Sequence, residues 1–277
     1  MLIRTGAFYK AFKYSVFALL TVNTGHFFFE NLAGVSFTYG QGLNFGDIIV
    51  AYTDAIDTAA WLVLLLLLEL ETSLVPDEKL KGWAGASINA ASVLCWAAII
   101  YSFYGYVATL GVPYGFAPYA GVDPCGLVGA GASLATSLAQ YLPLDAENCL
   151  TLAAGAYFNT GDAMFATPEN VSLIKRLAWT DVVNAGIWLI IVVILELEIY
   201  LQSSKLFGGA FFIAYKSFKL VLYGVLVVDV FYWLALGEPW AAWDALLWLV
   251  AFFFIEMNML SWQEENAKIR DGAAAIE

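Results

Sequence analysis

Carboxylates inside apolar segments are the groups of this sequence that could carry chemistry. A pattern of an acidic or amide residue, a tryptophan four positions later and a glutamate eight positions after that occurs three times. The copies begin at Asp57, Asn184 and Asp244, and they end in Glu69-Leu-Glu71, Glu196-Leu-Glu198 and Glu256-Met-Asn258. A charged side chain inside a membrane costs roughly 2.5 kcal/mol or more unless it is paired, and such acids commonly mark proton or cation pathways.

The two terminal polar residues of each copy face different ways on a helix. At 100° per residue, Glu69 and Glu71 lie roughly 160° apart, and only Glu71 shares a narrow arc with Asp57. Glu69, Glu196 and Glu256 occupy the position that all three copies repeat. If the copies pack around a pseudo-symmetry axis, these glutamates form a ring at one depth.

A second pattern, Tyr-Lys-x-Phe-Lys, opens two other apolar segments. Its lysines are Lys10 and Lys13 in the first copy and Lys216 and Lys219 in the second. Asn23 and Asp229 follow the second lysine of each copy by ten residues. With six membrane spans drawn, these lysines lie at the same depth as the repeated glutamates.

Two interpretations of these charges remain open. In the first, the lysines pair with the glutamates and fix the register and orientation of the helices. In the second, some of the acids line a polar path whose outer half is formed by Asp57, Asn184, Asp229 and Asp244. The seven apolar residues between each tryptophan and its glutamate weaken the second interpretation, because a continuous path needs polar groups along its length.

The composition indicates a membrane-embedded chain. Of the 277 residues, 61% are hydrophobic and 13% are charged, whereas an average soluble domain is about 45–50% apolar and about 25% charged. Six apolar segments are long enough to cross about 30 Å of hydrocarbon. They cover residues 8–30, 48–75, 84–110, 177–201, 208–236 and 240–262. The lipid bilayer is therefore the first expected partner.

We predict an all-α polytopic membrane protein with six transmembrane helices, arranged as three two-helix repeats. The repeats cover residues 1–76, 77–202 and 203–265, and a cytoplasmic tail covers residues 266–277. An insertion at residues 112–173 separates the third helix from the fourth. Its stretches 127–142 and 146–158 are rich in Ala and Leu, which favours a helical insertion.

Cysteines and basic residues predict the orientation of the chain. Cys125 and Cys149 both lie in the insertion, and a disulfide between them requires an oxidising compartment. With six spans, only Lys175 and Arg176 fall on the side of the insertion, and the other ten lysines and arginines fall on the opposite side. The positive-inside bias then predicts cytoplasmic termini and an extracytoplasmic insertion, in a bacterial-type cytoplasmic (inner) membrane.

Charge and motif content exclude several function classes. A formal net charge of −12 argues against nucleic acid as a partner, because nucleic-acid binding needs a basic surface. A single histidine, His26, cannot supply a bis-His haem site. The sequence has no phosphate-binding loop, nucleophile elbow, paired metal-ligand motif or dinucleotide fingerprint. We therefore expect no enzyme activity, no cofactor and no metal site.

Two functions remain. The first is the translocation of protons or a small cation through the repeated carboxylates. The second is a non-catalytic, structural or accessory role in a larger membrane complex, with the carboxylates used in Lys–Glu pairs. Partners in the second case would be other membrane subunits or further copies of the chain.

Overall fold

The chain forms two compact units in the computed structural model, which describes residues 7–38, 47–70, 82–121, 123–161, 163–201 and 209–274. One unit consists of Met1–Asn23 and Tyr223–Glu277, and the other consists of Thr24–Leu222. Helices α1 (Ala7–Thr38) and α7 (Gly209–Leu236) each contribute residues to both units.

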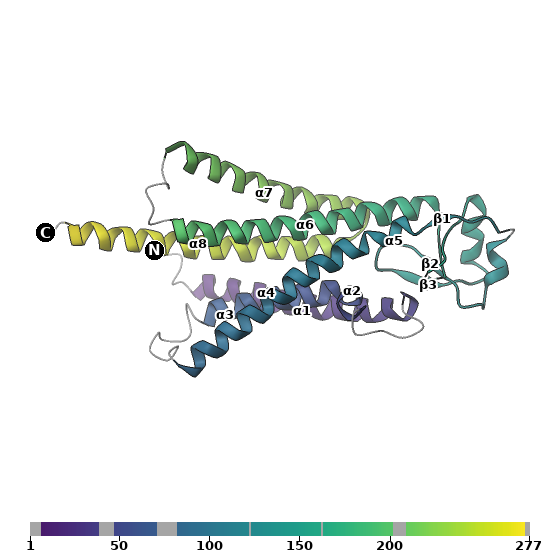
Figure 1. Cartoon of the computed structure of the whole chain (residues 1–277), viewed down its shortest axis with the longest axis horizontal. Coiled ribbons are helices and arrows are strands. Elements are labelled where there is room, and N and C mark those ends of the chain that lie inside the picture. Colours follow the sequence, from purple (N-terminus) through teal and green to yellow (C-terminus); the bar gives the residue numbers. More distant parts are fainter. Residues whose placement is uncertain are drawn as a thin grey trace. The chain divides into compact units, whose positions relative to one another are not determined.

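Four helical segments of the described chain are long and apolar enough to cross a membrane. They are Trp83–Tyr114, Pro168–Leu195, Ile213–Leu236 and Pro239–Met257. These segments belong to the long ribbons labelled α4, α6, α7 and α8 in Figure 1, and they are consistent with an integral membrane protein in contact with lipid. The six spans, the three repeats and the orientation in an inner membrane stay predictions.

The unit of Met1–Asn23 and Tyr223–Glu277 contains the start of α1, the end of α7, and α8 (Pro239–Ala274). Aromatic rings join α1 to α8. Tyr9 and Phe12 meet the ring of Phe254 edge to face, with centroids 5.3 and 5.6 Å away. Helix α8 continues to Ala274, so most of the predicted tail, 266–277, is helical.

A tight turn at Gly237 joins α7 to α8. Gly237 has a φ of +87°, which glycine adopts without strain. Its N–H donates to the carbonyl of Leu234, and the N–H of Glu238 donates to the carbonyl of Trp233. This pair of bonds is a Schellman motif, which satisfies the last carbonyls of α7. Pro239 then begins α8 at a position where its missing N–H has no helical partner to lose.

Helices α3 (Thr53–Glu69) and α4 (Trp83–Thr109) form an antiparallel pair in the unit Thr24–Leu222. At one end, Thr53 lies so close to Gly105 that a Cβ on the glycine would collide with the threonine side chain. Further along, the rings of Trp61 and Trp96 meet edge to face with centroids 5.8 Å apart. The absence of a side chain at Gly105 therefore sets how closely the two helices approach.

The span predicted over residues 48–75 is interrupted near its start. Helix α2 (Ile48–Ala51) is followed by Tyr52, whose φ of −122° and ψ of 29° lie outside the helical region. The N–H of Tyr52 still donates to the carbonyl of Ile48 over 3.0 Å, and α3 begins at the next residue. The first turn of α3 thus starts at a break in the chain's direction, not in the middle of a continuous helix.

The insertion is a small β domain, so the prediction of a helical insertion is wrong. Its strands are β1 (Ala117–Pro118), β2 (Ser133–Ala135), β3 (Tyr141–Pro143), β4 (Tyr157–Asn159) and β5 (Met164–Ala166). They form one sheet in the order β1-β4-β5-β2-β3, in which β2 and β5 are parallel and the other neighbours are antiparallel. We term residues 115–167 the β domain.

Glycine and proline explain why the predicted helices at 127–142 and 146–158 do not form. Gly129 and Gly131 have φ values of +79° and +84°, which interrupt a helix, and Gly155 has a φ of +144°. Proline in a helix interior removes a hydrogen bond and clashes with the preceding turn, so Pro143 limits a helix from the other side. The remaining pieces are long enough only for strands and for the 3₁₀ helices η3 (Pro124–Leu127) and η4 (Asn148–Ala154).

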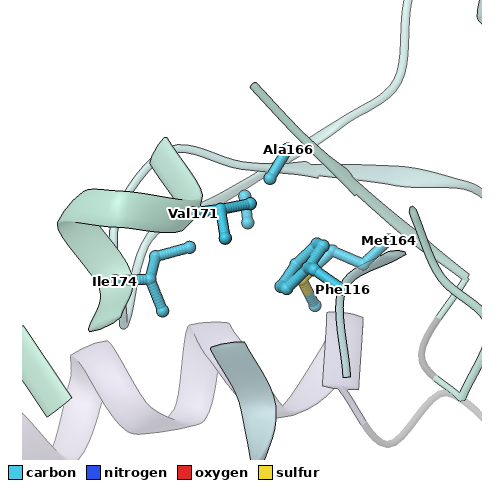
Figure 2. Packing of buried hydrophobic residues seen from close by; sticks show 6 residues of the cluster. Phe116, Met164, Ala166, Val171 and Ile174 are labelled. Carbon is cyan, nitrogen blue, oxygen red and sulfur yellow. The ribbon is translucent and has the colours of Figure 1, made fainter. Parts of the chain in front are cut away.

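Helix α6 (Pro168–Leu201) is attached to the β domain by an apolar core. Val171 and Ile174, on its first turns, lie against Phe116, Met164 and Ala166, as Figure 2 shows. All of these side chains are buried. The helix begins at a proline within the predicted insertion, well before the predicted start of the fourth span at about residue 177, because its first turns belong to this core.

The predicted disulfide between Cys125 and Cys149 is confirmed. It joins η3 to η4, and the two Cα atoms lie 5.2 Å apart across a sequence separation of 24 residues. Cys149 is buried in a second apolar core with Leu134, Leu144, Leu152 and Phe165. The disulfide therefore covalently joins two short 3₁₀ helices, η3 and η4.

Replacing Cys125 and Cys149 together by serine should destabilise the β domain by about 3 kcal/mol, because the opened loop regains conformational entropy in the unfolded state. Thermal unfolding of the purified protein, with and without reductant, measures this loss. Cys95→Ser is the matched control, since Cys95 is a free cysteine on α4. An equal loss of stability in the control would contradict the assignment.

Candidate functional site

A cluster of polar side chains lies at the start of α3, inside the unit Thr24–Leu222. Asn31 of α1 donates from Nδ2 to Oδ2 of Asp54 over 3.2 Å, and its Oδ1 accepts the N–H of Ala55 over 3.2 Å. The hydroxyl of Tyr106, on α4, donates to Oδ2 of Asp57 over 3.4 Å. We term Asn31, Asp54, Asp57 and Tyr106 the aspartate cluster.

Local sequence brings the two carboxylates of this cluster together. Asp54 and Asp57 are three residues apart, so a helix presents them on one face. They lie in the first turns of α3, where unpaired N–H groups and the helix dipole favour negative charge. Two of their partners are a neutral amide and a neutral hydroxyl, which can hydrogen-bond to a carboxyl group whether it is ionised or protonated.

Ser102 adds a buried hydroxyl on the face of α4 that contacts α3. Its side chain is 0% exposed, and within the described part of the chain its Oγ has no hydrogen-bond partner. On α4, Ser102 lies roughly 60° from Gly105, which contacts Thr53, and roughly 40° from Tyr106, which contacts Asp57. The hydroxyl therefore faces the first turns of α3. A buried polar atom without a partner costs about 1–3 kcal/mol, and an ordered water or ion is a common explanation for one.

The unit of Met1–Asn23 and Tyr223–Glu277 holds two similar contacts. Asn23 of α1 is buried and donates from Nδ2 to Oδ1 of Asp244, on α8, over 3.1 Å. The hydroxyl of Tyr223, on α7, donates to Oε1 of Glu256 over 3.1 Å. Asp229 is also buried on α7. Two acids of the third copy of the repeated pattern thus accept hydrogen bonds from neutral side chains on other helices.

The first aspartates of the first and third copies of the pattern make similar hydrogen bonds. Asp57 accepts from Tyr106, and Asp244 accepts from Asn23, in each case across a helix–helix contact. In the second copy this position is Asn184, which is half-buried on α6. The shared feature of the two aspartates is a neutral donor on a neighbouring helix.

The lysines of the Tyr-Lys-x-Phe-Lys pattern contact tyrosine rings. The Nζ of Lys13 lies 6.0 Å from the ring centroid of Tyr9, and the Nζ of Lys219 lies 5.9 Å from that of Tyr215. Both contacts join residues four apart on a helix, so the two copies form the same local cation–π pair. Lys13 is buried, whereas the first lysines of the two copies, Lys10 and Lys216, are exposed.

Part of the predicted site lies outside the described residues. Glu69 is buried on α3, but Glu71 is not among the described residues. The side chains of Glu196, Glu198 and Asn258 are likewise not described. The predicted ring of glutamates and the predicted lysine–glutamate pairs therefore stay predictions.

Sequence reasoning missed several residues of these contacts: Asn31, Asp54, Ser102, Tyr106 and Tyr223. For Asp54 a signal was present, because it precedes Asp57 by three residues and so shares its helix face. The other four lie on helices that carry none of the repeated acids, and only the packing of those helices brings them to a carboxylate.

The chain matches no known family. Comparison with family models, with curated proteins and with solved structures gives no match. Among the residues that the structure describes, no group of three or more His, Cys, Asp or Glu side chains could hold a metal ion. An ion at the aspartate cluster would therefore need hydroxyl and amide oxygens beside the two carboxylates.

Proposed function

We propose that the protein is an integral membrane protein that moves protons or a small cation across the bilayer. The observation that carries this proposal is the aspartate cluster, together with the buried hydroxyl of Ser102 on the adjoining face of α4. Two carboxylates, the hydroxyl of Tyr106 and the amide of Asn31 lie between apolar helices, and hard cations prefer oxygen ligands of these kinds. Ionisable residues inside membrane-spanning helices are expensive and are typically functional.

The contacts of the other unit support the same proposal. Asp244 and Glu256 accept hydrogen bonds from Asn23 and Tyr223, which are neutral donors. An amide or hydroxyl partner can follow a carboxyl group through protonation, because each can act as donor or acceptor. A carboxylate with such a partner can take up and release a proton while its contact with the neighbouring helix persists.

One observation, the burial of Lys13, supports the alternative of an accessory role in a membrane complex. Its Nζ lies 5.3 Å from the ring centroid of Tyr14 and contacts Tyr9 as well. A buried lysine is stable when its charge is compensated by neighbouring groups. This role predicts that changing Lys13 disrupts assembly with a partner and that the purified protein conducts no ion.

Ion flux into liposomes tests the proposed function. Purified protein should carry H⁺, Na⁺ or K⁺ down an imposed gradient, followed with a trapped pH-sensitive or ion-sensitive dye. Changing Glu69, Glu196 and Glu256 together to glutamine should lower the initial rate about tenfold or more, because each repeat then loses one carboxylate.

The control for this experiment is Glu147→Gln, an exposed residue of the β domain, which should keep the wild-type rate. Folding of each variant is checked by its elution from a sizing column and by its thermal unfolding. A folded wild-type protein that carries none of the three ions would refute translocation and leave the accessory role.

A further inference from the structure

Helix α6 passes from the core of the β domain to an exposed apolar surface within two turns. Val171 and Ile174 are buried against strand residues of the β domain (Figure 2). From Trp179 onward, the side chains on one side of the helix are apolar and exposed, including Val183 and Ile190. The span Pro168–Leu195 contains both regions. The boundary between the β domain and the hydrocarbon of a bilayer therefore falls between Ile174 and Trp179.

Three side chains, Tyr114, Lys175 and Trp179, meet at this boundary, and Arg176 follows Lys175 in the sequence. The Nζ of Lys175 lies 4.7 Å from the ring centroid of Tyr114, which follows α4 in the short helix α5 (Gly111–Tyr114). The Nε1–H of Trp179 donates to the hydroxyl of Tyr114 over 3.2 Å. Tyr114 is 60% exposed and Trp179 is 49% exposed. Arg176 is exposed as well, and its Nε donates to the carbonyl of Ser172 over 3.4 Å. We term Tyr114, Lys175, Arg176 and Trp179 the collar.

The amino-acid types of the collar are those of a membrane–water interface. Tyrosine and tryptophan are enriched at the level of the lipid headgroups, because each has an apolar ring and one polar group. Lysine and arginine at the same level keep their charges in the headgroup region while their stems lie along apolar surface. The two aromatic rings are joined by a hydrogen bond, and the lysine charge is held over one of them, so the group is organised before any ligand arrives.

The charge of the collar stands out from its surroundings. Lys175 and Arg176 are the only basic residues of the sequence between Lys81 and Lys205. The neighbouring β domain exposes carboxylates, among them Asp123, Asp145 and Glu147. Two adjacent positive charges at an apolar boundary complement a negative group that lies at the same depth, and the phosphate of a phospholipid is such a group.

We propose that the collar binds the phosphate of an anionic phospholipid in the leaflet next to the β domain. The ammonium of Lys175 and the guanidinium of Arg176 make charge-assisted hydrogen bonds to the phosphate oxygens. The exposed faces of Tyr114 and Trp179 contact the glycerol and the first carbons of the acyl chains. This lipid fixes the depth of α6 and holds the β domain against the membrane surface.

Lipid binding to the purified, delipidated protein tests this proposal. Native mass spectrometry, with dioleoyl phosphatidylglycerol or dioleoyl phosphatidylcholine added to the micelles, gives the affinity for the first bound lipid. Lys175→Gln with Arg176→Gln should weaken phosphatidylglycerol binding about 10- to 30-fold. Phosphatidylcholine binding should weaken less, because the choline of that lipid already balances the charge of its phosphate. The charge-conserving pair Lys175→Arg with Arg176→Lys should retain most of the preference for phosphatidylglycerol.

Two results would overturn the proposal. One is unchanged phosphatidylglycerol binding in the folded glutamine variant, whose folding is checked by thermal unfolding. The other is complete displacement of phosphatidylglycerol by millimolar inorganic phosphate, which would assign the collar to a soluble anion. Resistance of the bound lipid to inorganic phosphate supports the proposal, because a phospholipid is held by its acyl chains as well as by its phosphate.

Discussion

Changing Asp54 and Asp57 together to asparagine should lower the ion flux through the reconstituted protein about tenfold or more. Asparagine is close to aspartate in shape, and its side-chain oxygen can still accept from Tyr106, so the packing of α3 against α4 is kept. The variant loses both negative charges and both sites of protonation. A tenfold change corresponds to about 1.4 kcal/mol, less than the cost expected when an ion loses two charged ligands. The initial rate of H⁺, Na⁺ or K⁺ entry into liposomes measures the effect.

The variant Ser102→Ala distinguishes two roles for the buried hydroxyl, binding an ion or filling space between helices. If the buried hydroxyl only fills space, its removal leaves the flux unchanged and raises thermal stability slightly, since no hydrogen bond is lost. If it faces an ion or water held by the aspartate cluster, the flux falls while the protein stays folded, and this is the expected result. Ser87→Ala is the control on the same helix, where the exposed Oγ donates to the carbonyl of Trp83 over 2.9 Å. If the Asp54→Asn, Asp57→Asn variant and the Ser102→Ala variant both carry ions at the wild-type rate, the aspartate cluster has no part in translocation.

Long helices were predictable because hydrophobicity and length suffice to define them. The predicted spans at 84–110 and 208–236 correspond closely to α4 and α7, since glycine or proline marks an end of each. The disulfide was predictable because Cys125 and Cys149 share one insertion. The β domain was not, because Ala and Leu suit a helix locally, whereas its short strands are stabilised only by pairing with residues far along the chain.

The candidate site was predictable only on the helices that carry the repeated pattern. Asp57 and Asp244 stand out by their spacing to a tryptophan and a glutamate. Their partners, Tyr106 and Asn23, depend on the register between helices, which a single sequence does not encode in any local spacing. The hydrogen-bond donors that only the structure identifies are amide and hydroxyl side chains. Such residues are common in any sequence, so they cannot be recognised as partners of a carboxylate until the structure places them next to one.

Gly105→Ala should destabilise the α3–α4 pair by about 1–3 kcal/mol, the cost of overpacking a close contact. At an open helical position the same change is stabilising by about 1 kcal/mol, so the sign of the effect reports the packing. A Cβ at Gly105 would lie 3.1 Å from Cγ2 and 3.3 Å from Cβ of Thr53, and would collide with its Oγ1. Thr53 has little room to retreat, because it is buried and its Oγ1 donates to the carbonyl of Val50 over 3.1 Å. Thermal unfolding in detergent measures the loss.

The matched control is Gly224→Ala on α7, where a Cβ meets nothing within 4 Å and stability should be equal or higher. Adding Thr53→Ala to Gly105→Ala removes Oγ1 and Cγ2 and should recover much of the lost stability. Because Thr53 directly precedes Asp54, a displacement at this contact also moves the aspartate cluster. Gly105→Ala should therefore lower both stability and ion flux, and the double variant should restore them together. A Gly105→Ala protein as stable as the wild type would show that this contact does not set the spacing of α3 and α4. A double variant with restored stability but without restored flux would show that the functional acids lie outside the aspartate cluster.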